Sequence, residues 1–280
     1  MLITEITTAE IKKIFKNNTN KKDYLNRFFS MKGFGSPLKT KFDQQIIDTW
    51  DYKNSKQVIR EMFKETDKYQ RCLECKALLD IALSEWNQLS LGQLEWPFAA
   101  AAFDDHVHTL NRNTELSETE KDEVLKSEIV KFRRIKKISE LRNDYIEYLI
   151  FQNENVIPTF GNNRGVDFFI DGKPFDQKVS KSVGRVFIDA NGSDYRNIAL
   201  SHPELVAKSL YENQDEDRFG SEPRLLIVYL DTDMTTDQIK EQLENIDFST
   251  PLNIDFTYYH SSIGEATSYN TDCFLVLLHH

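Results

Sequence analysis

The sequence of 280 residues predicts an α/β fold, in which a mostly helical N-terminal region, residues 1–115, precedes an α/β domain, residues 116–280. Three observations predict this fold class. Long segments of the first region place apolar residues at helical spacing. Beyond residue 155, short runs rich in β-branched and aromatic residues are bounded by Gly, Asn and Asp. Helical segments lie between the later runs, which is typical of a sheet covered by helices.

The N-terminal region has its longest helical pattern at residues 55–89, which contain neither Gly nor Pro. Gly92 and Pro97 then interrupt the pattern, so we expect a break between residues 90 and 98. The apolar stripe expected along residues 55–89 consists of Ile59, Phe63, Leu73, Leu78, Ile81 and Trp86.

Residues 116–155 predict either one long helix or two shorter ones. Ser117 and Glu120 form a capping box, and further acidic residues crowd the first turns. The apolar stripe continues to about Phe151, so helical structure is expected to lead directly into the strands.

The rest of the chain predicts strands separated by helices. The helix expected first has Pro203 near its start, a position that proline favours. Strands are expected at residues 156–160, in a hairpin at 166–180, and at 224–231, 253–260 and 273–280; helices are expected at 201–216 and 235–246; and residues 187–197 are expected to be a loop.

Composition and charge limit the possible functions. No apolar run approaches the ~18 residues of a membrane span, and the N-terminus lacks a signal-peptide pattern. Three cysteines, an odd number, fit a reducing compartment, so we expect a cytoplasmic protein. The net charge of −10 does not exclude a DNA enzyme, because only the surface that faces phosphates must be basic. Basic clusters at residues 12–27 and 131–137 read most simply as solvated helix faces.

Residues 165–181, GVDFFIDGKPFDQKVSK, predict a β-hairpin with charges on one face. Asp171-Gly172 between two apolar runs favours a type I′ turn. A two-residue loop then places Asp167 opposite Asp176. Because side chains alternate along a strand, one face collects apolar residues around the polar Gln177, namely Val166, Phe168, Ile170, Phe175 and Val179, and the other carries Asp167, Asp176, Lys178 and Ser180.

The charged face predicts a cation site. Asp167 and Asp176 repel each other across the strands, and Lys178 supplies only one positive charge. A hard cation such as Mg²⁺, which binds one or two carboxylates and several waters, would complete the charge balance. The alternative is an exposed hairpin face on which these three side chains are merely solvated.

The spacing Asp, eight residues, Asp-x-Lys resembles the PD-(D/E)xK nuclease superfamily, to which most type II restriction endonucleases belong. The resemblance covers roughly residues 116–280 and implies a restriction-endonuclease-like core, a mixed sheet flanked by helices. The order of expected elements, helix, three antiparallel strands, helix and strand, agrees with it. Two departures are that Val166 stands where the family has proline, and that the second acid, Asp176, is Asp rather than the commoner Glu.

The resemblance implies site residues and a cofactor. Asp167, Asp176 and Lys178 would be catalytic, and Asp167, Asp176 and the carbonyl of Gln177 would hold one or two Mg²⁺ ions. A helix acid often joins such sites, and Glu147 fits best, with Glu140 and Asp144 as rivals. Lys181 and Arg185 are expected to contact DNA phosphates, or else to be solvated surface cations.

The function expected from the resemblance is Mg²⁺-dependent cleavage of double-stranded DNA at a specific sequence, as in the restriction half of a restriction-modification pair. We expect a homodimer, because palindromic sites are cut by two-fold symmetric proteins. Residues 1–115 would shape the DNA cleft or form the dimer interface. No membrane contact and no nucleotide cofactor are expected. Two alternatives stay open: a structure-selective repair or resolvase-type nuclease on the same core, and an inert α/β binding module.

Two other motifs predict no metal site. Cys72 and Cys75 have metal-ligand spacing but lack a second pair, so they are expected within a helix. Residues 104–109, DDHVHT, carry two histidines and are expected to form a polar loop.

Overall fold

The computed structural model describes residues 6–15, 21–37, 40–98, 102–163, 165–215 and 219–280. These residues form a mixed α/β protein with a six-stranded sheet, so the predicted α/β class is confirmed. The chain divides into two compact units, one made of Met1–Gln70 with Tyr148–His280 and the other of Arg71–Glu147. The division expected near residue 115 falls between two helices of the second unit.

The N-terminal part of the first unit is helical. Phe63, on the fourth helix, packs edge-on against Phe160 of the first strand at 6.0 Å between ring centroids, and Phe15 stacks on the same ring at 5.6 Å. Burial of these aromatic rings attaches the helices to the sheet. The helices are α1 (Thr8–Ile14), α2 (Lys21–Met31), α3 (Phe42–Asp48) and α4 (Tyr52–Lys64).

The Arg60 side chain of α4 caps the C-terminus of the long helix α7 (Glu118–Gln152). Its Nη1 donates to the carbonyl oxygens of Asn153 at 2.8 Å and Val156 at 2.7 Å, and its Nη2 to that of Phe151 at 2.9 Å. The last carbonyls of a helix have no partner within the helix, so a cation there satisfies and stabilises them. The chain therefore enters the first strand from a fixed direction.

The sheet of the first unit has the order β1-β2-β3-β4-β6-β5. Neighbouring strands are antiparallel from β1 to β3 and between β5 and β6, while β4 runs parallel to both β3 and β6. The central strand β4 is buried along its whole length, as expected for a parallel strand covered on both faces. The strands are β1 (Val156–Asn163), β2 (Val166–Ile170), β3 (Lys173–Ser180), β4 (Arg224–Tyr229), β5 (Leu252–His260) and β6 (Glu265–Leu278).

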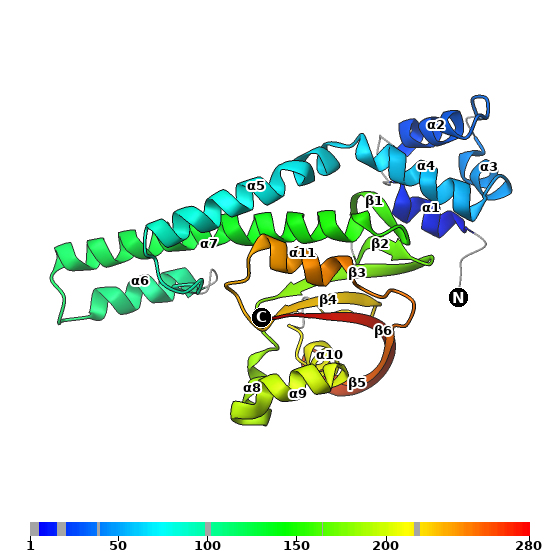
Figure 1. Cartoon of the computed structure of the whole chain (residues 1–280). Coiled ribbons are helices and arrows are strands. Elements are labelled where there is room, and N and C mark those ends of the chain that lie inside the picture. Colours follow the sequence, from blue (N-terminus) through cyan, green and yellow to red (C-terminus); the bar gives the residue numbers. More distant parts are fainter. Residues whose placement is uncertain (1–5, 16–20, 38–39, 99–101, 164, 216–218) are drawn as a thin grey trace. The chain divides into compact units, whose positions relative to one another are not determined.

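Helices cover both faces of the sheet: α11 lies on one side, and α8, α9 and α10 lie on the other (Figure 1). The expectation of a loop at residues 187–197 was wrong, because these residues belong to α8, to a short 3-10 turn at Gly192–Asp194 and to α9. Phe187 and Ala199 are buried in the core beneath them, and burial overrides a loop-like composition. The helices are α8 (Arg185–Asn191), α9 (Tyr195–Ser201), α10 (Pro203–Glu212) and α11 (Thr236–Glu244).

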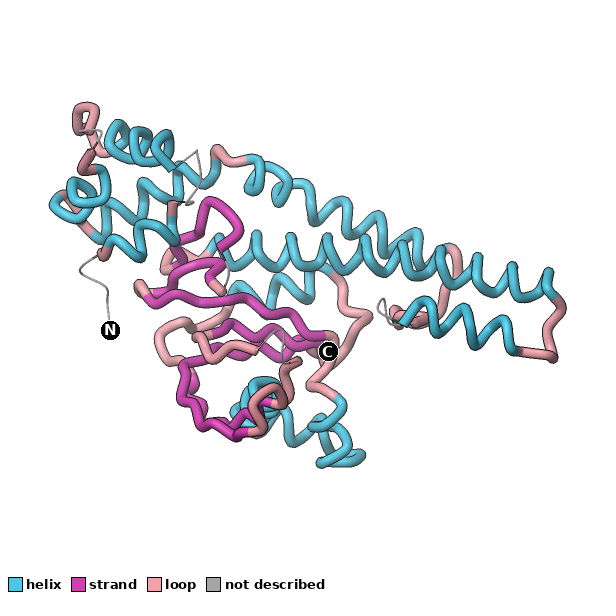
Figure 2. The backbone as a smooth tube through the Cα atoms, turned by 180° about the vertical axis from the view of Figure 1, so that it is seen from behind, coloured by secondary structure: helices cyan, strands magenta, loops and turns pink. Residues whose placement is uncertain are grey.

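The second unit consists of helices, and Figure 2 shows α5 (Asp67–Gln88) and α7 running side by side. Arg134 of α7 donates to Glu85 of α5 at 2.9 Å. The capping box at the start of α7 is confirmed, since Ser117 N–H donates to Glu120 at 2.8 Å and Glu120 N–H to Ser117 Oγ at 3.4 Å. Residues 118–152 form one helix rather than two.

The helical pattern at residues 55–89 is divided between α4 and α5. The prediction of its apolar stripe was wrong for three residues. Leu73, Leu78 and Ile81 are 48%, 42% and 53% exposed. The face that α5 buries is lined largely by smaller side chains, which a search for large apolar residues overlooks. Its buried residues are Cys72, Cys75, Leu79, Ala82 and Trp86.

The other two motifs are helical. Cys72 and Cys75 lie buried in α5, and burial raises the pKa of the Cys75 thiol to about 11. The segment expected as a polar loop, residues 104–109, instead belongs to α6 (Phe103–Arg112), because His106 pairs with Glu128 of α7 at 2.7 Å and stacks on Phe98. Within the described parts of the chain, no helix combines the length and apolarity needed to cross a membrane.

An ion pair between α9 and Asp231, which lies just beyond the end of β4, makes the stability of the protein depend on pH. Arg196 of α9 donates to both oxygens of Asp231, at 2.9 and 2.6 Å, and this pair, helped by the His280 N–H, lowers the pKa of Asp231 to about 2. The unfolded value lies near 3.9, so the stabilisation is complete above pH ~4 and is lost as the pH falls towards 2.

We therefore expect Asp231→Asn to lower the free energy of unfolding by about 1 kcal/mol at pH 6, since partial exposure weakens the pair. The difference from the parent protein should shrink as the pH falls from ~4 to ~2. Urea denaturation across this range measures it, and Arg196→Gln, which removes the same pair from the other side, should behave alike. A difference that does not change with pH would contradict the assignment.

Candidate active site

The hairpin that carries the predicted site folds as its turn residues require. Asp171 and Gly172 both have positive φ, 44° and 80°, as a type I′ turn demands. The expected register is confirmed next to the turn, where the pairs are Phe168–Phe175, Phe169–Pro174 and Ile170–Lys173.

Beyond Phe175, strand β3 leaves β2 and joins β4. A regular antiparallel ladder would pair the Gln177 N–H with the carbonyl of Val166. Instead the Gln177 N–H donates to Asp167 Oδ2 at 2.7 Å, while the Asp176 N–H donates to the Pro223 carbonyl at 3.0 Å. Parallel pairing with β4 then runs from Asp176 to Ser180. The two aspartates therefore lie where β2 and β3 diverge, a place at which a side chain has replaced a ladder hydrogen bond.

Asp167 is a partly buried carboxylate with a raised pKa. Burial is the largest cause of the increase, and the neighbouring charge of Asp176 adds to it. The Gln177 N–H, Lys68 and Lys178 act in the opposite direction. The expected direct pairing of Asp167 with Asp176 is not formed, because β3 has already left β2 at Asp176. The charge of Asp176 still disfavours ionisation of Asp167, and two lysines reduce that repulsion.

Asp176 is almost fully buried and lies between two cations. Its side chain is 7% exposed, with Lys178 Nζ at 2.7 Å and Arg224 Nε at 3.6 Å from Oδ2. Neither contact has hydrogen-bond geometry, and Oδ2 accepts no hydrogen bond from any described residue. Two cations therefore compensate the charge of this carboxylate, while the absence of a hydrogen bond from the described residues leaves Oδ2 able to accept a further ligand.

Arg224, the first residue of β4, is held on several sides. Its Nη1 donates to Gln214 Oε1 at 2.7 Å, its Nη2 donates to Glu222 Oε1 at 3.2 Å, and its guanidinium lies over the Tyr211 ring at 5.1 Å. The side chain is 5% exposed. Arg224 is therefore a fixed positive charge beside Asp176, supported by both hydrogen bonds and a cation–π contact.

Two site residues were missed in the sequence. Arg224 stands at the start of an otherwise apolar strand, and that single charge was the available signal. Lys68 lies in the first turn of α5, with its Nζ 5.5 Å from the centre of the Phe151 ring. No local pattern distinguishes Lys68 from the other lysines of the helical region.

The remaining predicted residues lie in two places. Lys181 follows β3, and Arg185 begins α8, where its Nε contacts Asp189 at 2.8 Å. Both side chains are exposed. The helix acids Glu147, Glu140 and Asp144 lie on α7 within the second unit, and their part in a metal site stays a prediction.

The donor set fits a magnesium ion. Mg²⁺ prefers oxygen ligands and commonly takes only one or two carboxylates, with waters and substrate oxygens completing its shell. Asp167, Asp176 and the Gln177 carbonyl offer such oxygens, and Asp176 Oδ2 lacks a hydrogen-bond donor. Among the described residues no three His, Cys, Asp or Glu side chains cluster as a metal cage would require. The oxygens of this hairpin would suit a hard cation that keeps several of its waters.

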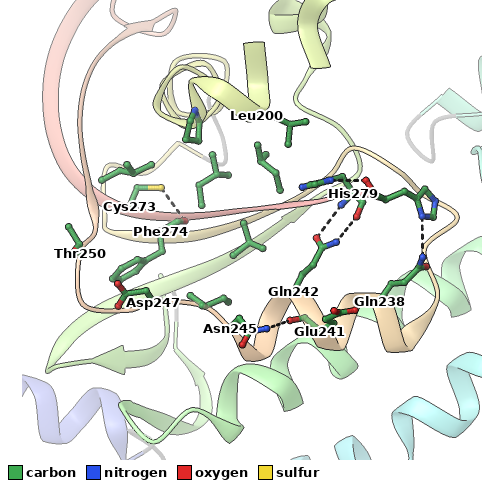
Figure 3. A pocket seen from close by; sticks show the side chains of 17 residues that line it. Leu200, Gln238, Glu241, Gln242, Asn245, Asp247, Thr250, Cys273, Phe274 and His279 are labelled. Carbon is green, nitrogen blue, oxygen red and sulfur yellow. Dashed lines mark hydrogen bonds between the residues drawn. The ribbon is translucent and has the colours of Figure 1, made fainter. Parts of the chain in front are cut away.

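A separate pocket of about 830 Å³ lies beside α11 and β6 (Figure 3). Its polar lining is partly occupied by internal contacts, since Gln242 donates to the His279 carbonyl and accepts from the His279 N–H. Asp167, Asp176 and Lys178 do not line this pocket.

In comparisons with known proteins, the chain matches no family model, no curated protein and no solved structure.

Proposed function

We propose that the protein is a Mg²⁺-dependent endonuclease that hydrolyses phosphodiester bonds of double-stranded DNA at a specific sequence. One observation carries the proposal: Asp176 is buried next to Asp167, with Lys178 against a carboxylate oxygen that accepts no hydrogen bond from the described residues. This constellation lies at the residues that resemble the PD-(D/E)xK motif. The order α7, three antiparallel strands, helices and a parallel β4 supports the proposal as well.

Each residue has a defined task in this proposal. Asp167, Asp176 and the Gln177 carbonyl would hold the ion, with Glu147 as a further candidate. When bound, Mg²⁺ supplies an activated water and a counter-charge for the phosphate. Lys178 would orient the attacking water and neutralise charge that develops on the phosphate. Lys181 and Arg185 would contact neighbouring phosphates and set the position of the DNA backbone.

The proposal includes an assembly and a compartment. A homodimer would cut both strands of a two-fold symmetric site. A cytoplasmic location agrees with the three cysteines, all of which lie in the described residues and carry free thiols.

The experiment is a digest of several unmodified plasmid and phage DNAs. We expect discrete fragments with Mg²⁺ and intact DNA with EDTA, because each cut needs the ion. Cleavage confined to branched DNA would favour the repair or resolvase-type nuclease. Intact DNA throughout, with protein shown to be folded by circular dichroism, would overturn the proposal and leave the inert binding module.

A further inference from the structure

The two cations beside Asp176 are anchored very differently. Arg224 is 5% exposed and is held by Gln214 and Glu222. Lys178 is 50% exposed, and its 2.7 Å contact with Asp176 Oδ2 lacks hydrogen-bond geometry. A long, half-exposed lysine held by charge alone can leave at little cost, whereas the arginine cannot.

The oxygen that Lys178 contacts is also the one best suited to a cation. Asp176 Oδ2 is buried and accepts no hydrogen bond from the described residues, so its lone pairs are directed at no donor. The ammonium group at 2.7 Å stands where a cation bound to that oxygen would compete for the same space and the same charge.

We propose that Lys178 holds the cation position on Asp176 in the metal-free protein, and that a divalent ion and this lysine exchange on one carboxylate oxygen. The inference rests on the proposed nuclease function, for which it assigns a second position to Lys178. Once displaced, the ammonium group is free to face the phosphate. Arg224 stays in place and keeps Asp176 oriented while the lysine moves.

The test is calorimetric titration of the full chain with Mg²⁺ alone, without DNA. We expect Lys178→Met to bind Mg²⁺ at least about tenfold more tightly than the parent protein, since a competitor that occupies the oxygen ~90% of the time reduces the apparent affinity by that factor. Methionine keeps the unbranched stem of the side chain, one atom shorter, and removes its charge.

Lys173→Met is the matched control. Lys173 lies on the same strand, is 45% exposed, and pairs with a different aspartate, Asp272. The Lys173→Met substitution removes one positive charge from the same strand but away from Asp176. Its Mg²⁺ affinity should stay within about threefold of the parent value, because solvent and salt screen an exposed charge that does not contact the site. Adding Asp176→Asn to Lys178→Met should abolish the gain in affinity.

Three results would overturn the exchange: equal affinities for the parent protein and Lys178→Met, an equal gain for Lys173→Met, or a gain that survives Asp176→Asn. Magnesium binding and DNA cleavage are measured separately. DNA cleavage by the parent protein without a gain in Mg²⁺ affinity for Lys178→Met would reject the exchange and support the nuclease function. A gain in affinity without any DNA cleavage would support the exchange and reject the nuclease function.

Discussion

Asp176→Asn is expected to abolish DNA cleavage while leaving DNA binding largely intact. The substitution keeps the shape of the side chain and removes the charge that would hold the ion. Loss of even one preorganised electrostatic contact at a transition state costs about 10² to 10³ in rate, so we expect a loss of roughly 10³-fold or more. Initial cleavage rates with Mg²⁺ measure the loss, and gel-shift titration in EDTA measures binding.

Asp171→Asn is the control for this substitution. It makes the same chemical change on the same hairpin, at the turn, where asparagine accepts the positive φ of 44°. Its cleavage rate should match that of the parent protein. Full activity of Asp176→Asn would reject the site assignment, even if the protein proved to be a nuclease.

Arg224→Met is expected to have the largest effect on stability. Removing this buried cation leaves Asp176 without its fixed counter-charge and removes one donor from each of Gln214 and Glu222, so that Gln214 Oε1 keeps only the Gly220 N–H. Loss of one partner from a buried charged network typically costs about 3–5 kcal/mol, because the remaining charge stays buried and uncompensated. Urea denaturation, followed by both fluorescence and circular dichroism, measures the change.

Arg27→Met provides the comparison for a surface pair. Arg27 is 50% exposed and contacts Glu65 at 2.8 Å, so its loss should cost at most ~1 kcal/mol. If Arg224→Met were no more destabilising than Arg27→Met, the network around Asp176 would contribute no net stability. The hypothesis that Arg224 orients the Asp176 carboxylate would then be rejected.

Local features were predicted well. The Asp171-Gly172 turn and the first three residue pairs of the hairpin followed from the φ that a type I′ turn requires. The start of α7 followed from Ser117 and Glu120, because a capping box satisfies helix donors within one turn. Features that depend on distant contacts were predicted poorly. Residues 187–197 form helices over a core that only the folded sheet provides.

The candidate site shows the same division between local and distant interactions. By itself, the sequence determined that Asp167, Asp176 and Lys178 belong to one hairpin, since turn and register are set within a few residues. Tertiary structure alone decided that Asp176 is buried, that β3 leaves β2 for β4, and that Arg224 and Lys68 lie near the aspartates. The physical reason is that strand pairing and burial join residues far apart in the chain, whose proximity no local pattern encodes.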